Sequence, residues 1–137
     1  MSIRFSRDAA FVLGTLTPIA ETIRRWSTWR EDPAAYFDDF FLGGQLLYGA
    51  WRVLRDPRAG QRFLAAGWGF ACGMIYPSFF FQLNRVRLGE PDPAPIPSEW
   101  VLAIKGVGFA LAILSLVVSL RPLPPDERGR ESPRTPA

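Results

Sequence analysis

The stretch FLAAGWGFACGMIYPSFFFQLN, residues 63–84, carries no charged side chain between Arg62 and Arg85. A helix rises about 1.5 Å per residue, so this segment is long enough to cross a hydrocarbon layer of about 30 Å. Each helix of a soluble bundle needs a charged outer face, and this segment offers none in any direction. The stretch therefore predicts a transmembrane helix rather than a helix of a soluble bundle.

Three further apolar blocks predict three further helices. WVLAIKGVGFALAILSLVVSL (100–120) is interrupted only by Lys105, residues 33–54 start with Pro33 after a potential cap at Asp32, and residues 8–25 form the weakest block. The predicted fold class is therefore all-α, a polytopic transmembrane four-helix bundle with short loops over residues 1–120. The predicted helices cover about 8–25, 33–54, 62–84 and 98–120, and a disordered cytoplasmic tail covers 121–137.

Two other interpretations of these blocks were weighed. Residues 8–25 have the basic start and short apolar middle of a signal peptide, but cleavage after Ala20 would place Pro18 where a small residue is required. The net charge of +3 raises the possibility of nucleic-acid binding. The arginines, however, lie in short clusters between apolar blocks, which is typical of membrane loops and argues against a nucleic-acid partner.

The distribution of arginine predicts the orientation of the bundle. With four spans, the N-terminus, the 52–62 turn and the C-terminal tail share one side, which carries ten arginines against five on the other. The first side has Arg4, Arg7, Arg52, Arg55, Arg58, Arg62, Arg121, Arg128, Arg130 and Arg134, and the second has Arg24, Arg25, Arg30, Arg85 and Arg87. The positive-inside rule then places both termini in the cytoplasm of a multi-pass protein in the cell (inner or plasma) membrane, typical of small bacterial membrane proteins. The arginines at 52–62 serve as topology determinants or hold anionic lipid headgroups.

Composition limits the chemistry that the chain can perform. There is no histidine, so no imidazole is present as a base, a haem ligand or a zinc ligand. Cys72 is the single cysteine and lies in an apolar setting, which favours an inert thiol over a disulfide or a thiolate metal site. Adjacent Asp38 and Asp39 diverge on a helix and offer too few oxygens for a divalent cation. No cofactor, metal or catalytic residue is predicted.

Ionisable side chains inside the predicted spans are candidates for a buried polar cluster. Under the predicted topology, Asp38 and Lys105 both lie roughly 8 Å below the outer surface. A charge that faces lipid at such a depth costs about 2–3 kcal/mol, and pairing Lys105 with Asp38 or Asp39 lowers that cost. The candidate cluster consists of Glu21, Asp38, Asp39, Gln45, Tyr76 and Lys105. It is either an ion pair that fixes helix register or an outward-facing polar pocket.

Small residues predict where helices pack closely. In lipid, packing and interhelical hydrogen bonds replace the hydrophobic drive, so glycine and alanine gather where backbones approach. The candidate packing residues are Gly14, Gly49, Gly69, Gly73, Gly108 and Ala112.

Two functions follow from these patterns. The preferred one is a non-enzymatic accessory or scaffold subunit that packs through its small-residue faces, with the lipid bilayer and a second copy or another membrane protein as partners. The alternative is a small transporter or ligand-binding membrane protein that uses the Asp38, Asp39 and Lys105 cluster. An intramembrane enzyme is least favoured, because only carboxylates, Lys105 and tyrosines remain for acid–base chemistry.

Overall fold

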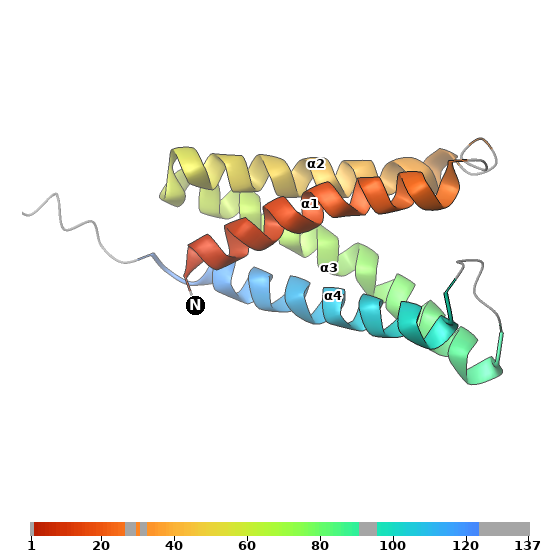
Figure 1. Cartoon of the computed structure of the whole chain (residues 1–137). Helices are drawn as coiled ribbons and strands as arrows, with labels where there is room; N and C mark the ends of the chain where they lie inside the picture. Colours follow the sequence, from red (N-terminus) through yellow and green to blue (C-terminus); the bar gives the residue numbers. More distant parts are fainter. Residues whose placement is uncertain (1, 27–29, 31–32, 91–95, 124–137) are drawn as a thin grey trace, which may run out of the picture.

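The computed structural model is a bundle of four helices, with no strand among the residues that it describes. These are residues 2–26, 30, 33–90 and 96–123. The helices are α1 (Ile3–Arg25), α2 (Pro33–Arg55), α3 (Pro57–Leu88) and α4 (Ser98–Leu120), drawn in Figure 1. The predicted all-α four-helix fold is thereby confirmed for the described residues. The predicted cap at Asp32, and the part of the predicted disordered tail that follows residue 123, lie outside the described residues.

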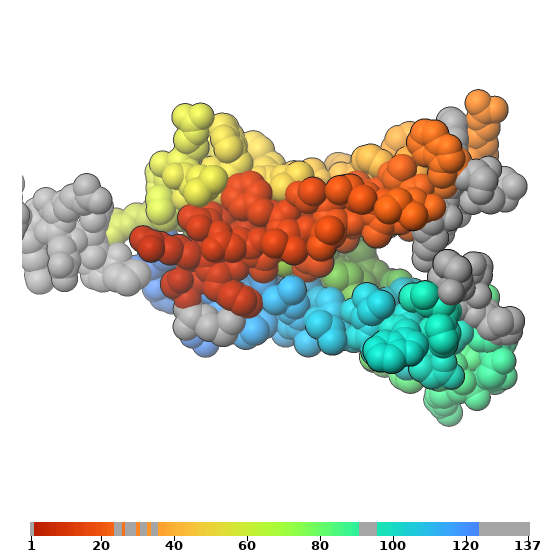
Figure 2. All heavy atoms as spheres, in the orientation of Figure 1, coloured from red at the N-terminus to blue at the C-terminus, as the bar shows by residue number. Residues whose placement is uncertain are grey.

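The helices run up and down in chain order. The N-terminus, the α2–α3 turn and the C-terminus of α4 lie at one end, here called the turn end, and the opposite end is called the loop end (Figure 1). Each helix packs against the next along the chain, whereas the described residues of α2 and α4 make no close backbone approach. The α1–α2 pair and the α3–α4 pair meet at the turn end and diverge toward the loop end, where the surfaces of α1 and α4 also part (Figures 1 and 2).

The third helix is longer than its apolar stretch indicated. It starts at Pro57 rather than residue 62, because the Asp56 carboxylate accepts hydrogen bonds from the backbone N–H of Arg58 (2.9 Å) and Ala59 (3.1 Å). It ends at Leu88 rather than residue 84, where Gly89 takes the left-handed conformation (φ 68°) that glycine tolerates. In the same way α1 starts at Ile3 rather than residue 8. Charged residues that flank an apolar run continue a helix, so the run marks only part of it.

The core lies where α1, α2 and α3 meet. It contains both small and large buried side chains. Among them are Trp68 and Leu64 of α3, and Leu46 and Ala50 of α2. Ala112 of α4 joins this cluster and is completely buried. The small residues allow the backbones to come close, and the large ones fill the space that remains.

Most of the apolar surface lies outside this core. The helices α3 and α4 are long and apolar enough to cross a membrane. Each contains an apolar stretch of 18 residues, yet only 22% of that stretch is buried inside the bundle. A core helix of a soluble protein would be mostly buried. Large hydrophobic side chains are also exposed along α1 and α2.

Candidate polar and helix-packing sites

Lys105 contacts the α3 helix in the interface between α3 and α4. Its Nζ lies 3.5 Å from the backbone oxygen of Ser78 and 3.5 Å from Oε1 of Gln82, both at the long limit of hydrogen bonding. Gln82 is only 1% exposed, and its Nε2 donates to the backbone oxygen of Ser98 at 3.4 Å. Gln82 was not among the candidate cluster residues, although it is the one amide in an otherwise apolar turn of α3.

The six candidate cluster residues differ in burial and lie on all four helices. Glu21 of α1 is 6% exposed, Asp39 is half-buried and Asp38 is exposed. Tyr76 is exposed on the outer side of the α3–α4 pair, where its ring contacts Phe80 (4.7 Å between centroids) and Phe109.

The two remaining candidates lie in different interfaces. Gln45 is half-buried in α2, with its backbone beside Gly67 of α3, whereas Lys105 lies on α4. Because α2 and α4 make no close backbone approach, a pair between Lys105 and Asp38 or Asp39 stays a prediction.

A second polar network joins three helices at the turn end. Ser6 of α1 donates to the backbone oxygen of Ser115 at 3.0 Å, and its hydroxyl lies 2.6 Å from that of Ser119. Gln61 of α3 donates from Nε2 to the backbone oxygens of Ser119 (2.7 Å) and Arg121 (2.6 Å). The three serines are buried. Ser115 and Ser119 share a helical face in the sequence, but Ser6 precedes the predicted start of the first helix, so the sequence analysis missed the network.

We expect Ser6→Ala and Ser119→Ala to destabilise the bundle by about 1 kcal/mol each, because each removes a buried interhelical hydrogen bond. The double variant should cost less than the two single changes added together, since both break the same hydroxyl pair. Unfolding by sodium dodecyl sulfate titration in mild detergent micelles measures these free energies. Strict additivity would show that the hydroxyl pair contributes nothing.

Glycines lie at the closest helix contacts. Gly14 of α1 and Gly43 of α2 face each other, such that a Cβ on either would lie 2.6–3.0 Å from the backbone oxygen of the other. Pro18 lacks the N–H that would bond the Gly14 carbonyl within α1, and the Gly14 oxygen lies 2.6 Å from where a Cβ on Gly43 would stand. Gly49 meets the backbone of Leu64, and Gly60 meets α2.

Three of the predicted packing glycines lie elsewhere. Added Cβ atoms at Gly69, Gly73 and Gly108 would meet nothing within 4 Å, so these positions are open in this chain. The spacing of Gly69 and Gly73 places them on one face of α3, but no described residue of another helix lies within 4 Å of a Cβ added at either position. Gly43 and Gly60 make close contacts that the sequence analysis did not assign to them.

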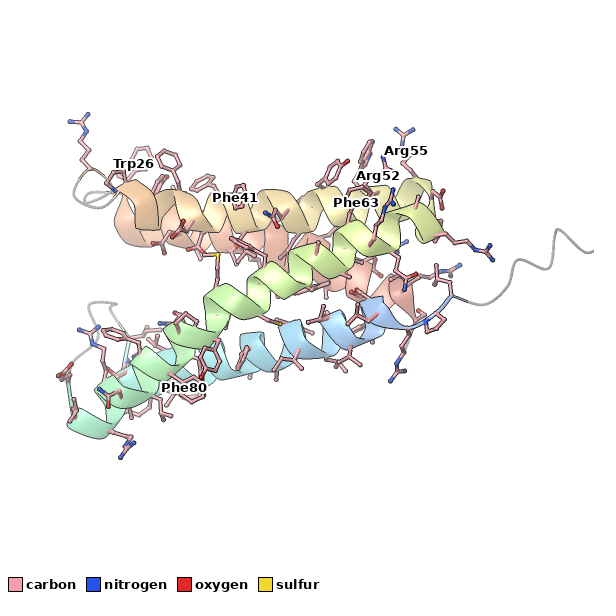
Figure 3. All side chains as sticks on the ribbon, turned by 180° about the vertical axis from the view of Figure 1, so that it is seen from behind. Trp26, Phe41, Arg52, Arg55, Phe63 and Phe80 are labelled. Atoms are coloured by element: carbon pink, nitrogen blue, oxygen red, sulfur yellow. The ribbon has the colours of Figure 1, made fainter. Side chains whose placement is uncertain are left out.

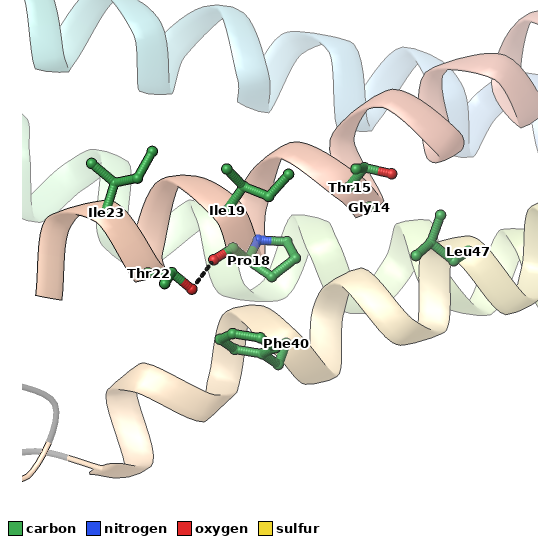
Figure 4. Close-up of a pocket in the computed structure, with 8 residues that line it drawn as sticks. All are labelled: Gly14, Thr15, Pro18, Ile19, Thr22, Ile23, Phe40 and Leu47. Carbon is green, nitrogen blue, oxygen red and sulfur yellow. Dashed lines mark hydrogen bonds between the residues drawn. The ribbon is translucent and has the colours of Figure 1, made fainter. Parts of the chain in front are cut away.

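A groove lies on the outer side of the α1–α2 pair (Figure 4). It has a volume of about 380 Å³ and no charged side chain in its lining. The hydroxyl of Thr22 is already engaged, because it donates to the Pro18 carbonyl at 2.7 Å. The lining residues are Gly14, Thr15, Pro18, Ile19, Thr22, Ile23, Phe40 and Leu47. Such a surface suits hydrocarbon rather than a polar ligand.

Among the described residues, no group of three histidine, cysteine, aspartate or glutamate side chains is placed to hold a metal ion. Comparison of the chain with protein-family models, curated proteins and solved structures found no match.

Proposed function

We propose that this chain is a small integral membrane protein whose four helices all cross the bilayer, and that it acts as a non-enzymatic accessory or scaffold subunit. The observation that carries the proposal is the exposure of α3 and α4, each of which contains an apolar stretch of 18 residues that is only 22% buried inside the bundle. In water these surfaces would be an aggregation hazard, whereas in lipid they are solvated by acyl chains.

The outer faces of α1 and α2 support four spans rather than two. Val12, Leu16, Ile19 and Ile23 recur at helical spacing on α1 and are all exposed. Each of these helices has 23 residues, which at about 1.5 Å per residue matches the thickness of a bilayer core. A two-span protein would leave these faces in water.

Exposed tryptophans mark both ends of the bundle, as expected for interfacial belts. Trp26 follows α1 and Trp100 lies in the first turn of α4, both at the loop end, while Trp51 lies near the turn end. The excess of arginine on the turn end supports its assignment to the cytoplasm, together with both termini.

The scaffold role is preferred over transport because the helices that carry Asp38 and Lys105 make no close backbone approach in the described part of the chain. Lys105 contacts α3, whereas Asp38 is exposed on α2, and the backbones of α2 and α4 stay apart. The open glycines of α3 and the apolar outer faces leave surface available to another membrane protein or a second copy.

We expect the full-length protein to stay in the membrane pellet after alkaline carbonate and urea washes and to be released only by detergent. Recovery of a monodisperse protein in plain buffer would contradict membrane insertion.

In pyranine-loaded proteoliposomes, the scaffold role predicts no proton flux above that of protein-free vesicles. A flux that Asp38→Asn or Lys105→Met abolishes would favour the transporter instead.

A further inference from the structure

Three arginines at the turn end are held against aromatic rings. The Cζ of Arg52 lies 5.0 Å from the centroid of Phe63, that of Arg62 lies 5.1 Å from the same ring, and that of Arg55 lies 5.3 Å from Trp51. Figure 3 shows Arg52, Arg55 and Phe63 together at this end of α2 and α3, opposite to Trp26. These residues with Tyr48 are here called the Arg–aromatic cluster.

The rings of the cluster also contact one another. The ring centroid of Tyr48 lies 5.5 Å from that of Phe63, in an edge-to-face arrangement, and 6.0 Å from that of Trp51. The cluster therefore has a fixed position across the α2–α3 contact, and its guanidinium groups have fewer rotamers to lose when they bind an anion. Tyr48 and Trp51 remain close to half exposed.

The positive charge of this cluster is not neutralised within the described part of the chain. Ion pairs such as Arg7 with Asp8 and Arg85 with Glu90 lie elsewhere, and no described residue forms an ion pair with the three arginines of the cluster. The neighbouring carboxylate of Asp56 instead accepts two backbone hydrogen bonds at the start of α3. Among the described residues, the cluster is thus a cationic surface without a carboxylate partner.

We propose that the Arg–aromatic cluster binds the phosphate of an anionic phospholipid, whose acyl chains run along Tyr48 and Trp51 toward the bilayer centre. Planar guanidinium groups match phosphate oxygens through paired hydrogen bonds. The aromatic rings beside them sit at the depth where headgroups join hydrocarbon. The cytoplasmic leaflet, to which the turn end is assigned, is the one rich in anionic lipid. This inference rests on the proposed membrane location.

The test is native mass spectrometry of the full-length protein in a neutral detergent, titrated with phosphatidylglycerol or phosphatidylcholine. We expect wild type to prefer phosphatidylglycerol, and the Arg52→Gln, Arg55→Gln, Arg62→Gln variant to bind it at least about tenfold more weakly. The control variant Arg4→Gln, Arg87→Gln, Arg121→Gln removes the same net charge from exposed positions and should keep most of the affinity. Circular dichroism shows whether each variant keeps its helical fold. If the Arg52, Arg55 and Arg62 triple variant unfolds, the single variant Arg55→Gln takes its place in the titration.

Equal losses in both triple variants, or equal binding of the two lipids, would overturn the proposal. Excess free glycerol phosphate should not displace the lipid, because it lacks the acyl chains that contact the aromatic rings. If glycerol phosphate displaced phosphatidylglycerol when both were present at the same concentration, the proposal would also be overturned. A protein that needs detergent but shows no lipid preference refutes this inference alone. A protein that is soluble without detergent refutes the membrane proposal itself.

Discussion

The Gly60→Ala variant is expected to lose more than about 3 kcal/mol of unfolding free energy, whereas Gly69→Ala gains about 1 kcal/mol. A Cβ at Gly60 would overlap the backbone of Arg52 and Val53 in α2, and main-chain atoms cannot rotate away as a side chain does. At Gly69 an added Cβ meets nothing within 4 Å, so only the better helix propensity of alanine remains. Both changes lie on α3 and introduce the same methyl group.

Thermal unfolding followed by circular dichroism in detergent micelles compares the two variants directly. If Gly60→Ala unfolds at the same temperature as Gly69→Ala, the close approach of α2 and α3 at the turn is wrong. A loss confined to Gly69→Ala would show that the open face of α3 is an interface in the purified protein, and would point to a second copy as the partner.

The helices could be predicted from sequence because uncharged runs and flanking breakers are local signals. The start of α3 was equally local, since Asp56 followed by Pro57 is a capping pattern and Gly89 is a helix stop. The interpretation used charge instead of caps and so gave bounds of 62–84. A charged residue does not end a helix in the interfacial region, because its side chain reaches water while its backbone stays bonded.

Contacts between helices could not be predicted in the same way. Periodicity shows which residues share a face of one helix, but not which neighbour that face meets. The pairing of Lys105 with Asp38 was inferred from their similar depths, and it stays a prediction, because depth does not show whether α2 and α4 are neighbours and their backbones make no close approach among the described residues. Gly60 stands among basic residues in the sequence rather than in an apolar repeat, and no sequence signal marked its close contact with the backbone of α2.

The second large effect is expected at Trp68, which is completely buried in the core cluster. Trp68→Ala should cost about 3 kcal/mol, because the remaining side chains cannot fill the cavity. The value is at the low end for tryptophan because, in the proposed membrane location, a side chain gains from packing but not from leaving water. Trp100→Ala, at a position that is 65% exposed, should change stability by less than about 0.5 kcal/mol.

A third variant separates the packing of Trp68 from its polar atom. Its indole Nε1 is buried and has no hydrogen-bond acceptor among the described residues, and an unpaired buried donor lowers stability. Trp68→Phe removes this N–H while keeping one aromatic ring, so we expect it to lose less than half of what Trp68→Ala loses. Sodium dodecyl sulfate unfolding titrations of all three variants provide the comparison. Equal losses in Trp68→Phe and Trp68→Ala would mean that the indole N–H has a partner in the membrane, such as a water molecule or a helix of another subunit.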